Sequence, residues 1–371
     1  MTNKMQEKPL IMLTAGGTGG HVFPAESLAE ELSKRGFDLA LMTDSRGKDN
    51  YHGKLSEITN YSVLSGALVG KSKLFKIKSL IKTCLGIVQA GFILLKRKPV
   101  CVVGFGGYAS FPCCMAAVLL GIDLVVHEQN SVMSRTNRFL GKYATFIATS
   151  FANTKFVPSR TPQILTGMPI RQAIAALSRQ DYHPTDEQGK FNLLIIGGSQ
   201  GAKIFGEVIP AAVRLLPQET QARLNIFHQC RKDEVEAVKT AYGDCKVTLT
   251  VSHFFENMAE LYAKTGLIIS RAGASSMAEI TAAHLPSILV PLPTAADDHQ
   301  TGNAAAVGQS KAGIVMEQKN FTAENLSEAL QRLLVDDKEL TIMADRAARL
   351  SIVDASKRLA DAIDKEIVSA N

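Results

Sequence analysis

Residues 10–21 read LIMLTAGGTGGH, and residues 192–202 read NLLIIGGSQGA. In both stretches a short apolar run leads into a turn that is rich in glycine. A short apolar run bounded by glycine is typical of a buried strand in a parallel sheet. A glycine-rich turn directly after the first strand is typical of nucleotide-binding α/β domains. The chain of 371 residues therefore begins the same kind of domain twice.

Apolar runs and helical stretches alternate after each of these turns, which indicates parallel sheets covered by helices. We expect strands at Leu10–Thr14, Leu39–Thr43, Val100–Val103, Leu124–His127, Phe146–Thr149, Asn192–Ile196, Leu224–His228, Val247–Val251, Leu267–Ser270 and Ser287–Val290. The predicted fold class is α/β, with two doubly wound Rossmann-like domains facing a cleft. Ligands of such sheets bind outside the carboxyl ends of the strands.

The domain boundaries follow from composition. Residues 168–190 are polar and contain proline and glycine, which predicts a linker. We therefore expect an N-terminal domain at residues 1–167 and a C-terminal domain at residues 191–344. The last stretch, about 345–371, has a helical pattern, and we expect it to pack back on the N-terminal domain.

Composition excludes several classes of protein. Hydrophobic residues make up 46% of the chain and charged residues 20%, so disorder as the main state is excluded. We expect no signal peptide, and no apolar run reaches the roughly 18 residues that a membrane-spanning helix needs. Six cysteines without a Cys-x-x-Cys pair predict reduced thiols in a cytoplasmic protein.

Positive charge is concentrated in the first domain. Residues 1–167 carry 20 Lys and Arg against 10 Asp and Glu, whereas residues 168–371 carry 21 against 25. Much of the excess lies where lysines interleave with apolar residues, at Lys71, Lys73, Leu74, Phe75, Lys76 and Lys78. Two interpretations stay open: a core helix with a solvated basic face, or a helix that enters a membrane interface while its lysines meet anionic lipid. Nucleic acid is not expected as a partner, because no motif for it is present.

Four glycine-rich turns follow predicted strands, at residues 16–20, 104–107, 197–201 and 272–276. Such turns let a phosphate approach the backbone amides at the start of a helix, and four of them favour a nucleotide or another phosphorylated ligand. No Asp-x-Asp pair and no His-Glu-x-x-His spacing occurs, so no metal site is predicted. Arg171 is then the candidate cation for a diphosphate.

Six motifs occur in a fixed order: GGTGGHVFPA (16–25), GFGGYASFP (104–112), HEQN (127–130), GGSQGA (197–202), SRAGASSMAE (270–279) and PLPTAADDHQTGNA (291–304). Together they resemble the MurG family, the UDP-N-acetylglucosamine transferases that convert lipid I to lipid II in peptidoglycan synthesis. The resemblance extends from residue 11 to about 310. It implies a glycosyltransferase-B fold, with the acceptor on the N-terminal domain and the sugar nucleotide mainly on the C-terminal one.

The resemblance also implies the reaction and its setting. An inverting hexosyltransferase moves N-acetylglucosamine from UDP-N-acetylglucosamine to the 4-hydroxyl of the muramyl sugar of lipid I. The protein is expected to be peripheral, on the cytoplasmic face of the inner membrane and in contact with its anionic surface. The sequence requires no cofactor. A divalent cation held by the diphosphates is left open, as are other cell-wall synthesis proteins as partners.

Residue roles follow from the same resemblance. His21 is the leading candidate for the base that activates the acceptor, and Gly106, Gly107 and Tyr108 resemble acceptor-side residues. The implied donor-side residues are Thr18, Gly19, Gly20 and Asn130 beside the sugar; Arg171 and Ser199 at the diphosphate; Phe255 beside the uracil; Ala274, Ser275, Ser276, Met277 and Ala278 in the helix facing the nucleotide; Glu279 at the ribose hydroxyls; and His299 and Gln300 at the sugar hydroxyls.

Some positions depart from the family pattern, and other functions stay open. Met133 and Ser134 replace a proline-glycine pair, and Met168 and Gly206 replace asparagines; these changes affect loops rather than proposed contacts. Turn 104–109 matches a dinucleotide fingerprint, although it is not the first turn of its domain, so a nicotinamide-dependent dehydrogenase is one alternative. A UDP-sugar 2-epimerase and a non-catalytic membrane adaptor are the others.

Overall fold

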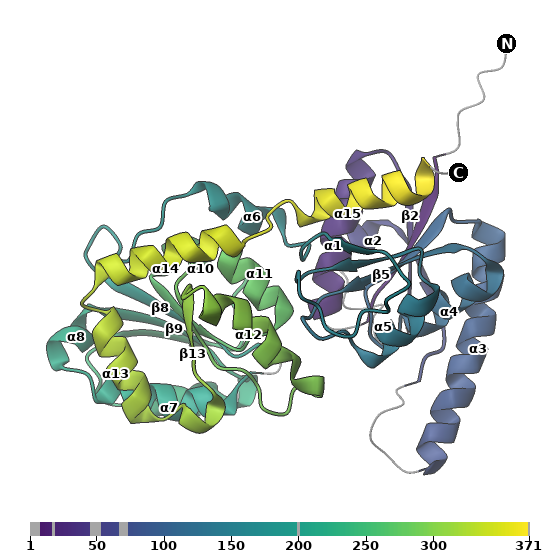
Figure 1. Ribbon diagram of the computed structural model, residues 1–371. Coiled ribbons are helices and arrows are strands. Elements are labelled where there is room, and N and C mark those ends of the chain that lie inside the picture. Colours follow the sequence, from purple (N-terminus) through teal and green to yellow (C-terminus); the bar gives the residue numbers. More distant parts are fainter. Residues whose placement is uncertain (1–7, 17–18, 45–52, 67–72, 199–200, 370–371) are drawn as a thin grey trace. The chain divides into compact units, whose positions relative to one another are not determined.

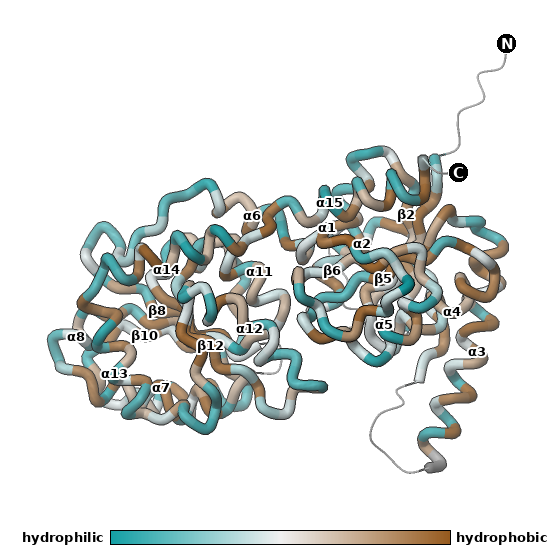
Figure 2. Tube along the Cα trace, in the orientation of Figure 1, coloured by the Kyte–Doolittle hydropathy of each residue, from teal (hydrophilic) through white to brown (hydrophobic). Residues whose placement is uncertain are grey.

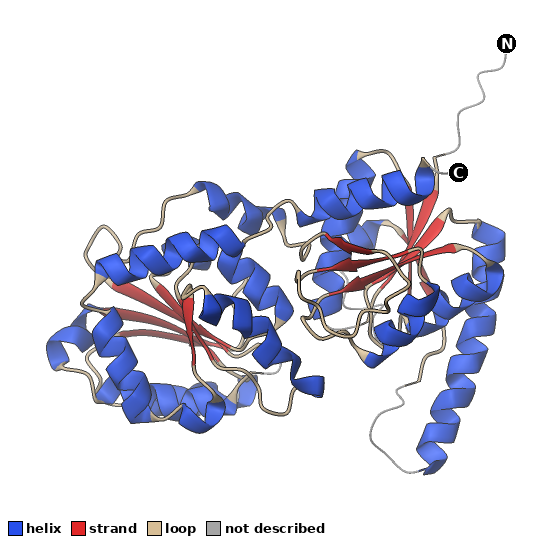
Figure 3. Ribbon diagram, in the orientation of Figure 1, coloured by secondary structure: helices blue, strands red, loops and turns tan. Residues whose placement is uncertain are grey.

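The computed structural model describes residues 8–16, 19–44, 53–66, 73–198 and 201–369, without the side chains of Lys73 and Leu74. The predicted residues Thr18, Ser199 and Lys71 lie outside the described residues. The chain divides into two compact units: unit 1 is Met1–Arg171 with Asp354–Asn371, and unit 2 is Gln172–Val353. In each unit, helices cover both faces of a parallel sheet (Figures 1 and 3).

Unit 1 contains, in its described part, a seven-stranded parallel sheet in the order β3-β2-β1-β4-β5-β6-β7. Its strands are β1 (Leu10–Thr14), β2 (Asp38–Thr43), β3 (Thr59–Ser62), β4 (Cys101–Gly104), β5 (Asp123–Glu128), β6 (Phe146–Thr149) and β7 (Gln163–Leu165). Its helices are α1 (Gly19–Lys34), α2 (Lys54–Glu57), α3 (Lys73–Arg97), α4 (Phe111–Leu120), α5 (Arg135–Leu140), η1 (Gly141–Tyr143), α15 (Ala355–Ile363) and η6 (Asp364–Val368). The central strands β1 and β4 are buried along their whole length, which explains why they are apolar without alternation.

The end of the chain belongs to unit 1. Helix α15 packs against α1, and Leu359 and Ile363 are fully buried in the core of this unit. An ion pair of 2.7 Å joins Arg35, directly after α1, to Asp361 in α15. The sequence placed the start of this returning segment at about residue 345, whereas the structure assigns residues to unit 1 only from Asp354.

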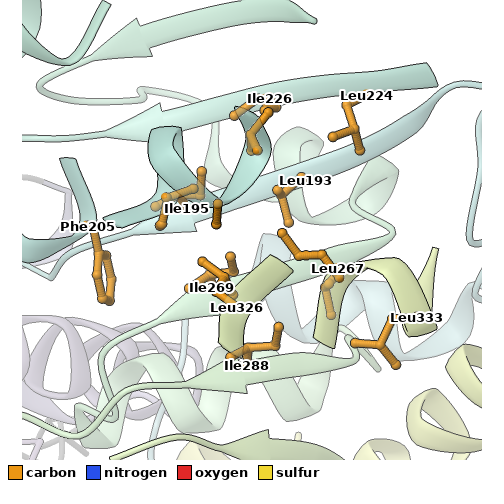
Figure 4. Packing of buried hydrophobic residues seen from close by; sticks show 14 of the residues in the cluster. Leu193, Ile195, Phe205, Leu224, Ile226, Leu267, Ile269, Ile288, Leu326 and Leu333 are labelled. Atoms are coloured by element: carbon orange, nitrogen blue, oxygen red, sulfur yellow. The ribbon is translucent and has the colours of Figure 1, made fainter. Parts of the chain in front are cut away.

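Unit 2 contains, in its described part, a six-stranded parallel sheet in the order β10-β9-β8-β11-β12-β13. Its strands are β8 (Phe191–Ile196), β9 (Leu224–Gln229), β10 (Thr248–Ser252), β11 (Leu267–Ser270), β12 (Ser287–Leu289) and β13 (Gly313–Val315). Its helices are α6 (Gln172–Ala175), η2 (Ala176–Arg179), α7 (Lys203–Arg214), α8 (Gln218–Arg223), η3 (Lys232–Glu234), α9 (Val235–Tyr242), α10 (Met258–Lys264), α11 (Ala274–Ala282), η4 (Ala296–Asp298), α12 (His299–Gln309), η5 (Gln318–Asn320), α13 (Ala323–Leu333) and α14 (Asp337–Leu350). Leu193, Ile195, Leu267 and Ile269 of its central strands pack in one buried cluster (Figure 4).

Most of the segment expected to be a linker, residues 172–190, is packed in unit 2. Within residues 168–190, α6 lies against α10 and α11, and Ile174 is buried. Tyr182 donates a hydrogen bond of 2.6 Å to the carbonyl oxygen of Gly266. The segment is polar because much of it is at the surface, yet buried contacts hold it against the unit.

Helix α3 exposes its large apolar side chains and buries small ones, the reverse of an ordinary surface helix. Its buried side is made of mostly small residues: Ser79, Thr83, Gly86, Ala90 and Leu94. This side packs against α4, and a Cβ at Gly86 would overlap the carbonyl oxygen of Leu64. Its large apolar side chains are instead exposed: Phe75, Ile77, Leu80, Ile81, Leu85, Val88, Phe92 and Leu95. The structure therefore does not favour the core-helix interpretation of this stretch.

By length and composition alone, α3 could also cross a membrane. Phe75–Arg97 contains an 18-residue window with a mean hydropathy of 1.5, so the expectation that no segment reaches this length was wrong. The reason is that Gln89 and the two glycines do not lower the average enough to break the run. Figure 2 shows hydrophobic segments along the helix, and Figure 1 shows its first turns extending past the rest of unit 1.

Candidate functional site

The four glycine-rich turns lie beside the points where the strand order reverses in the two sheets. In unit 1, β1 is the neighbour of β4, and their turns are residues 16–20 and 104–107. In unit 2, β8 is the neighbour of β11, and their turns are residues 197–201 and 272–276. Ligands of doubly wound sheets bind at such switch points, outside the carboxyl ends of the strands. Each unit therefore has one candidate ligand-binding edge at its switch point, which we call the half-site of that unit.

In unit 1 the two glycine turns contact each other directly. The backbone N–H of Gly16 donates a hydrogen bond of 3.2 Å to the carbonyl oxygen of Gly106. Gly106 and Gly107 have φ of +85° and +80°, a region that side chains with a Cβ rarely adopt. These glycines are therefore required for the shape of the turn, whatever it binds.

His21 lies in the first turn of α1, against both glycine turns. A Cβ added at Gly106 would lie 3.5 Å from its Nε2, and a Cβ added at Gly16 would lie 3.5 Å from its Nδ1. Burial lowers the pKa of His21 to about 4, because a charged imidazole would lose its hydration there. The ring is therefore neutral at pH 7 and able to accept a proton. Gly19 and Gly20 begin the same helix.

The HEQN motif ends β5 and is largely buried. The side-chain amide of Gln129 donates to the carbonyl oxygen of Phe105 at 2.7 Å and lies 3.3 Å from Nδ1 of His127. Nε2 of His127 lies 3.1 Å from the carbonyl oxygen of Gly167. Because a carbonyl only accepts, Nε2 carries the proton and Nδ1 accepts from Gln129. Burial lowers the pKa of His127 to about 4, which fits this neutral, structural role.

Glu128 organises the loop that follows. One carboxylate oxygen accepts from the backbone N–H of Asn130 at 2.9 Å and from its side-chain amide at 3.3 Å. The other accepts from the backbone N–H of Ser134 at 2.9 Å and from Nδ2 of Asn137 at 2.8 Å. Asn130, predicted beside the donor sugar, is therefore held in place by a buried carboxylate.

Replacing Glu128 with glutamine should destabilise unit 1. The new NH₂ group would face groups that are themselves donors, and a buried donor left unpaired costs about 1–3 kcal/mol. We expect the free energy of unfolding, measured with urea, to fall by that amount. An unchanged unfolding midpoint would show that the loop does not depend on this carboxylate.

The remaining predicted residues of unit 1 lie near the same edge of its sheet. Tyr108 follows β4 and is 38% exposed, as an acceptor contact would require. The guanidinium carbon of Arg171 lies 5.1 Å from the ring centroid of Phe23 in α1. A planar cation can stack in this way and still present N–H groups at its edge. Arg171 therefore belongs to unit 1, where its guanidinium lies against α1.

In unit 2 the glycine turn after β8 is closed around Gly198 and Gly201. Both have a positive φ, +82° and +69°, and the N–H of Gly201 donates to the carbonyl oxygen of Gly198 at 3.0 Å. A Cβ at Gly197 would lie 2.5 Å from the backbone nitrogen of Ala202. The backbone before α7 therefore lies too close to Gly197 for a side chain at that position.

Helix α11 begins beside that turn. Its N-cap residue, Gly273, has no side chain to cap the first turn, and the leading N–H groups of a helix have no partner within it. Of the predicted residues Ala274 to Ala278, Ser275, Ser276 and Ala278 are half-buried, while Ala274 and Met277 are buried. Glu279 is 8% exposed and its Oε2 accepts a hydrogen bond of 3.1 Å from the hydroxyl of Tyr262.

The other donor-side residues follow neighbouring strands of the same sheet. Phe255 comes after β10 and is half-buried, with its ring centroid 6.4 Å from that of Phe227. Oε1 of Gln300 accepts from the backbone N–H of Leu292 at 3.0 Å, which fixes the orientation of its amide. Nδ1 of His299 lies 2.7 Å from the carbonyl oxygen of Ala296, so Nδ1 carries a proton.

Sequence reasoning missed several residues that support these half-sites. Arg271 and Asn303 lie inside quoted motifs, yet they were given no role. Arg271 donates to the carbonyl oxygen of Val290 at 3.0 Å, and Asn303 donates to that of Ala272 at 3.0 Å. Tyr262 lies outside every motif and had no sequence signal. Among the described residues, no group of three or more His, Cys, Asp or Glu could hold a metal ion.

Family models match both units. The glycosyltransferase family 28 N-terminal domain matches residues 11–149, and the glycosyltransferase family 28 C-terminal domain matches residues 192–359. Curated relatives are named UDP-N-acetylglucosamine–N-acetylmuramyl-(pentapeptide) pyrophosphoryl-undecaprenol N-acetylglucosamine transferase. One from Paramagnetospirillum magneticum is 44% identical over 96% of each chain. One from Granulibacter bethesdensis is 38% identical over 100% of this chain and 97% of its own.

Solved structures show the same architecture. MurG from Acinetobacter baumannii is 32% identical, with a TM-score of 0.77 over 96% of this chain and 99% of its own. UDP-GlcNAc 2-epimerase from Neisseria meningitidis has a TM-score of 0.69 over 96% of this chain and 100% of its own. Its identity is 16%, so this second likeness concerns the fold alone.

Proposed function

The chain belongs to glycosyltransferase family 28, among the transferases that add N-acetylglucosamine to lipid I, and we propose that unit 1 handles the acceptor and unit 2 the donor. The chain is a hexosyltransferase with a glycosyltransferase-B fold. It transfers N-acetylglucosamine from UDP-N-acetylglucosamine to the muramyl sugar of lipid I, giving lipid II. Its two substrates are therefore a sugar nucleotide and a lipid-linked sugar.

Each unit has two glycine-rich turns at the switch point of its sheet, and the side chains that follow the strands differ between the units, which carries the division of roles. Both substrates contain a diphosphate, and each can take one of these amide-lined edges. In unit 2 the start of α11 and Glu279 follow β11, Phe255 follows β10 and Gln300 follows β12, all strands of one sheet. A carboxylate for ribose, a ring for uracil and an amide for sugar hydroxyls are the groups that the donor requires.

The chemistry is a single displacement with inversion. The 4-hydroxyl oxygen of the muramyl sugar attacks the anomeric carbon of the donor, while the bond to the diphosphate breaks and UDP leaves with the electron pair. His21, neutral at pH 7, takes the hydroxyl proton at an imidazole nitrogen. Arg171 and the helix amides stabilise the departing diphosphate. A divalent ion held by the diphosphates is compatible with this scheme, since it needs no protein ligand.

Helix α3 would bring the enzyme to its lipid substrate. Its exposed apolar side chains lie among the exposed lysines Lys76, Lys78 and Lys82, the arrangement that suits an anionic membrane interface. We therefore place the protein at the cytoplasmic face of the inner membrane as a peripheral enzyme. Lys73 and Leu74 lie in α3 as well.

A transfer assay with UDP-N-acetylglucosamine and a lipid I analogue tests the function, and Glu279→Ala tests the donor half-site. Losing a carboxylate that accepts ribose hydroxyls should weaken donor binding by about 30- to 150-fold. The KM for lipid I should hardly change, because that substrate is assigned to unit 1. Equal weakening toward both substrates, or toward neither, would show that Glu279 is misassigned.

A further inference from the structure

Tyr262 makes a buried contact that the proposed donor site does not yet use. Its hydroxyl donates a hydrogen bond of 3.1 Å to Oε2 of Glu279. Tyr262 is 3% exposed and Glu279 is 8% exposed, so water does not compete freely for this bond. A hydrogen bond to a carboxylate in such surroundings is stronger and more directional than one at the surface.

The helix that carries Tyr262 is capped by a local side-chain hydrogen bond at each end. Helix α10 begins directly after the segment that contains Phe255, and the side chain of Asn257 caps it by accepting from the N–H of Glu260 at 3.4 Å. At its other end Thr265 donates to the carbonyl oxygen of Leu261 at 2.6 Å. The helix also packs against β8 and α6. The phenol is therefore presented to Glu279 from a rigid element.

We propose that Tyr262 is a positioning residue for nucleotide recognition, which fixes the carboxylate of Glu279 in the orientation that receives the ribose hydroxyls. This inference rests on the donor role proposed for Glu279. A carboxylate that takes two hydroxyls must be held in one plane, since a rotated group loses at least one of the two bonds. Because α10 starts at the Phe255 segment, the contact also ties the uracil side of the half-site to its ribose side.

Tyr262→Phe removes only the hydroxyl and tests this directly. We expect the Kd for UDP-N-acetylglucosamine to rise by roughly 5- to 20-fold, with little change in kcat or in the KM for lipid I. The matched control is Tyr242→Phe. Tyr242 is equally buried in unit 2, and its hydroxyl lies 2.9 Å from Nδ1 of His228; neither residue is among the predicted donor contacts. This control should bind the donor like the parent.

Discrimination between UDP and its deoxyribose analogues is a measurement that a merely structural role of Tyr262 would not change. The parent should discriminate against 2′-deoxy- and 3′-deoxy-UDP, and Tyr262→Phe should discriminate less. In a Glu279→Ala background, Tyr262→Phe should have little further effect, because there is no carboxylate left to position.

Three different results would overturn the proposal. If Glu279→Ala weakens donor binding while Tyr262→Phe binds and discriminates like the parent, the tyrosine does not position the carboxylate. If neither variant changes donor binding although transfer to lipid I proceeds, Glu279 does not hold the ribose and the positioning role fails with it. An equal loss in Tyr262→Phe and Tyr242→Phe would indicate a general effect on folding and would also reject the proposal.

Discussion

His21→Ala should lower the turnover of transfer to lipid I by about 10²–10⁴-fold, the usual contribution of a general base. The imidazole lies against the two glycine turns of unit 1, at the switch point of its sheet. The Kd for UDP-N-acetylglucosamine should change little, because the donor contacts lie mainly in unit 2. Steady-state kinetics with separate donor titration measure both quantities.

A matched histidine checks that the loss is specific. His183 is exposed and has no assigned role in either half-site, so His183→Ala should retain the turnover of the parent. If His21→Ala keeps near-parental turnover, another group takes the proton, and carboxylates at the same edge of the sheet would have to be tested instead.

The pH dependence gives a second check on His21. Burial lowers its pKa to about 4, and a base must be deprotonated to act, so kcat/KM should stay constant down to about pH 5 and fall only near pH 4. An ordinary histidine would lose activity near its usual pKa of about 6.5. A bound anionic substrate favours the charged imidazole, so kcat should begin to fall at a higher pH than kcat/KM. Burial also lowers the pKa of His127 to about 4, so protonation of His127 is the other cause of a fall in kcat/KM near pH 4. A fall that persists in His21→Gln would be due to His127.

The sequence predicted the interior of both sheets better than their edges. Ten strands were expected, and each has a counterpart in the structure. The described strands that were not expected are β3, β7 and β13, which all lie at sheet edges. β3 and β7 are half-exposed and include polar residues, and β13 has three residues. A short strand paired on one side has no continuous apolar run to reveal it.

For the candidate site, the sequence predicted positions rather than partners. The glycine turns and the start of α11, which the motifs singled out, lie where the sheets reverse, and the HEQN segment lies at the end of β5, the neighbour of β4. The motifs did not reveal that Glu128 holds Asn130 and Asn137, or that Tyr262 reaches Glu279. Such pairs depend on tertiary packing, and Tyr262 precedes Glu279 by 17 positions on a different helix. No local pattern encodes a contact of this kind.

Helix α3 shows a similar limit. Its sequence is apolar almost all round, so periodicity could not tell which side is buried. In the structure the side with small residues, such as Gly86 and Ala90, is buried, because it lets the helix approach its neighbours closely. The large residues Ile77, Ile81 and Phe92 are exposed. An exposed stripe of large apolar side chains is unusual for a surface that faces only water. This is why the membrane contact deserves a quantitative test.

Replacing Lys76, Lys78 and Lys82 with glutamine should weaken binding to anionic vesicles by on the order of a hundredfold, since each lysine near such a surface is worth about 1 kcal/mol. All three are exposed in the first half of α3. The loss should be largest at low salt and shrink as salt screens the attraction. Vesicle sedimentation at two ionic strengths measures it.

The control removes the same charge elsewhere. Lys232, Lys239 and Lys246 are exposed in unit 2, and replacing them with glutamine should leave vesicle binding close to that of the parent. If both triple variants lose equally, net charge rather than α3 determines the attraction.

The apolar part of the contact should behave differently from the lysines. Phe92 is 70% exposed, and transferring a phenylalanine side chain out of water is worth about 1.5–3 kcal/mol. Phe92→Ser should therefore weaken binding by roughly 10- to 150-fold at either ionic strength, because burial of apolar area does not depend on screening. Donor binding by unit 2 should be the same in all of these variants. If the α3 lysine variant and Phe92→Ser both sediment with anionic vesicles like the parent at low salt, α3 does not contact the membrane. Its exposed stripe must then meet another surface.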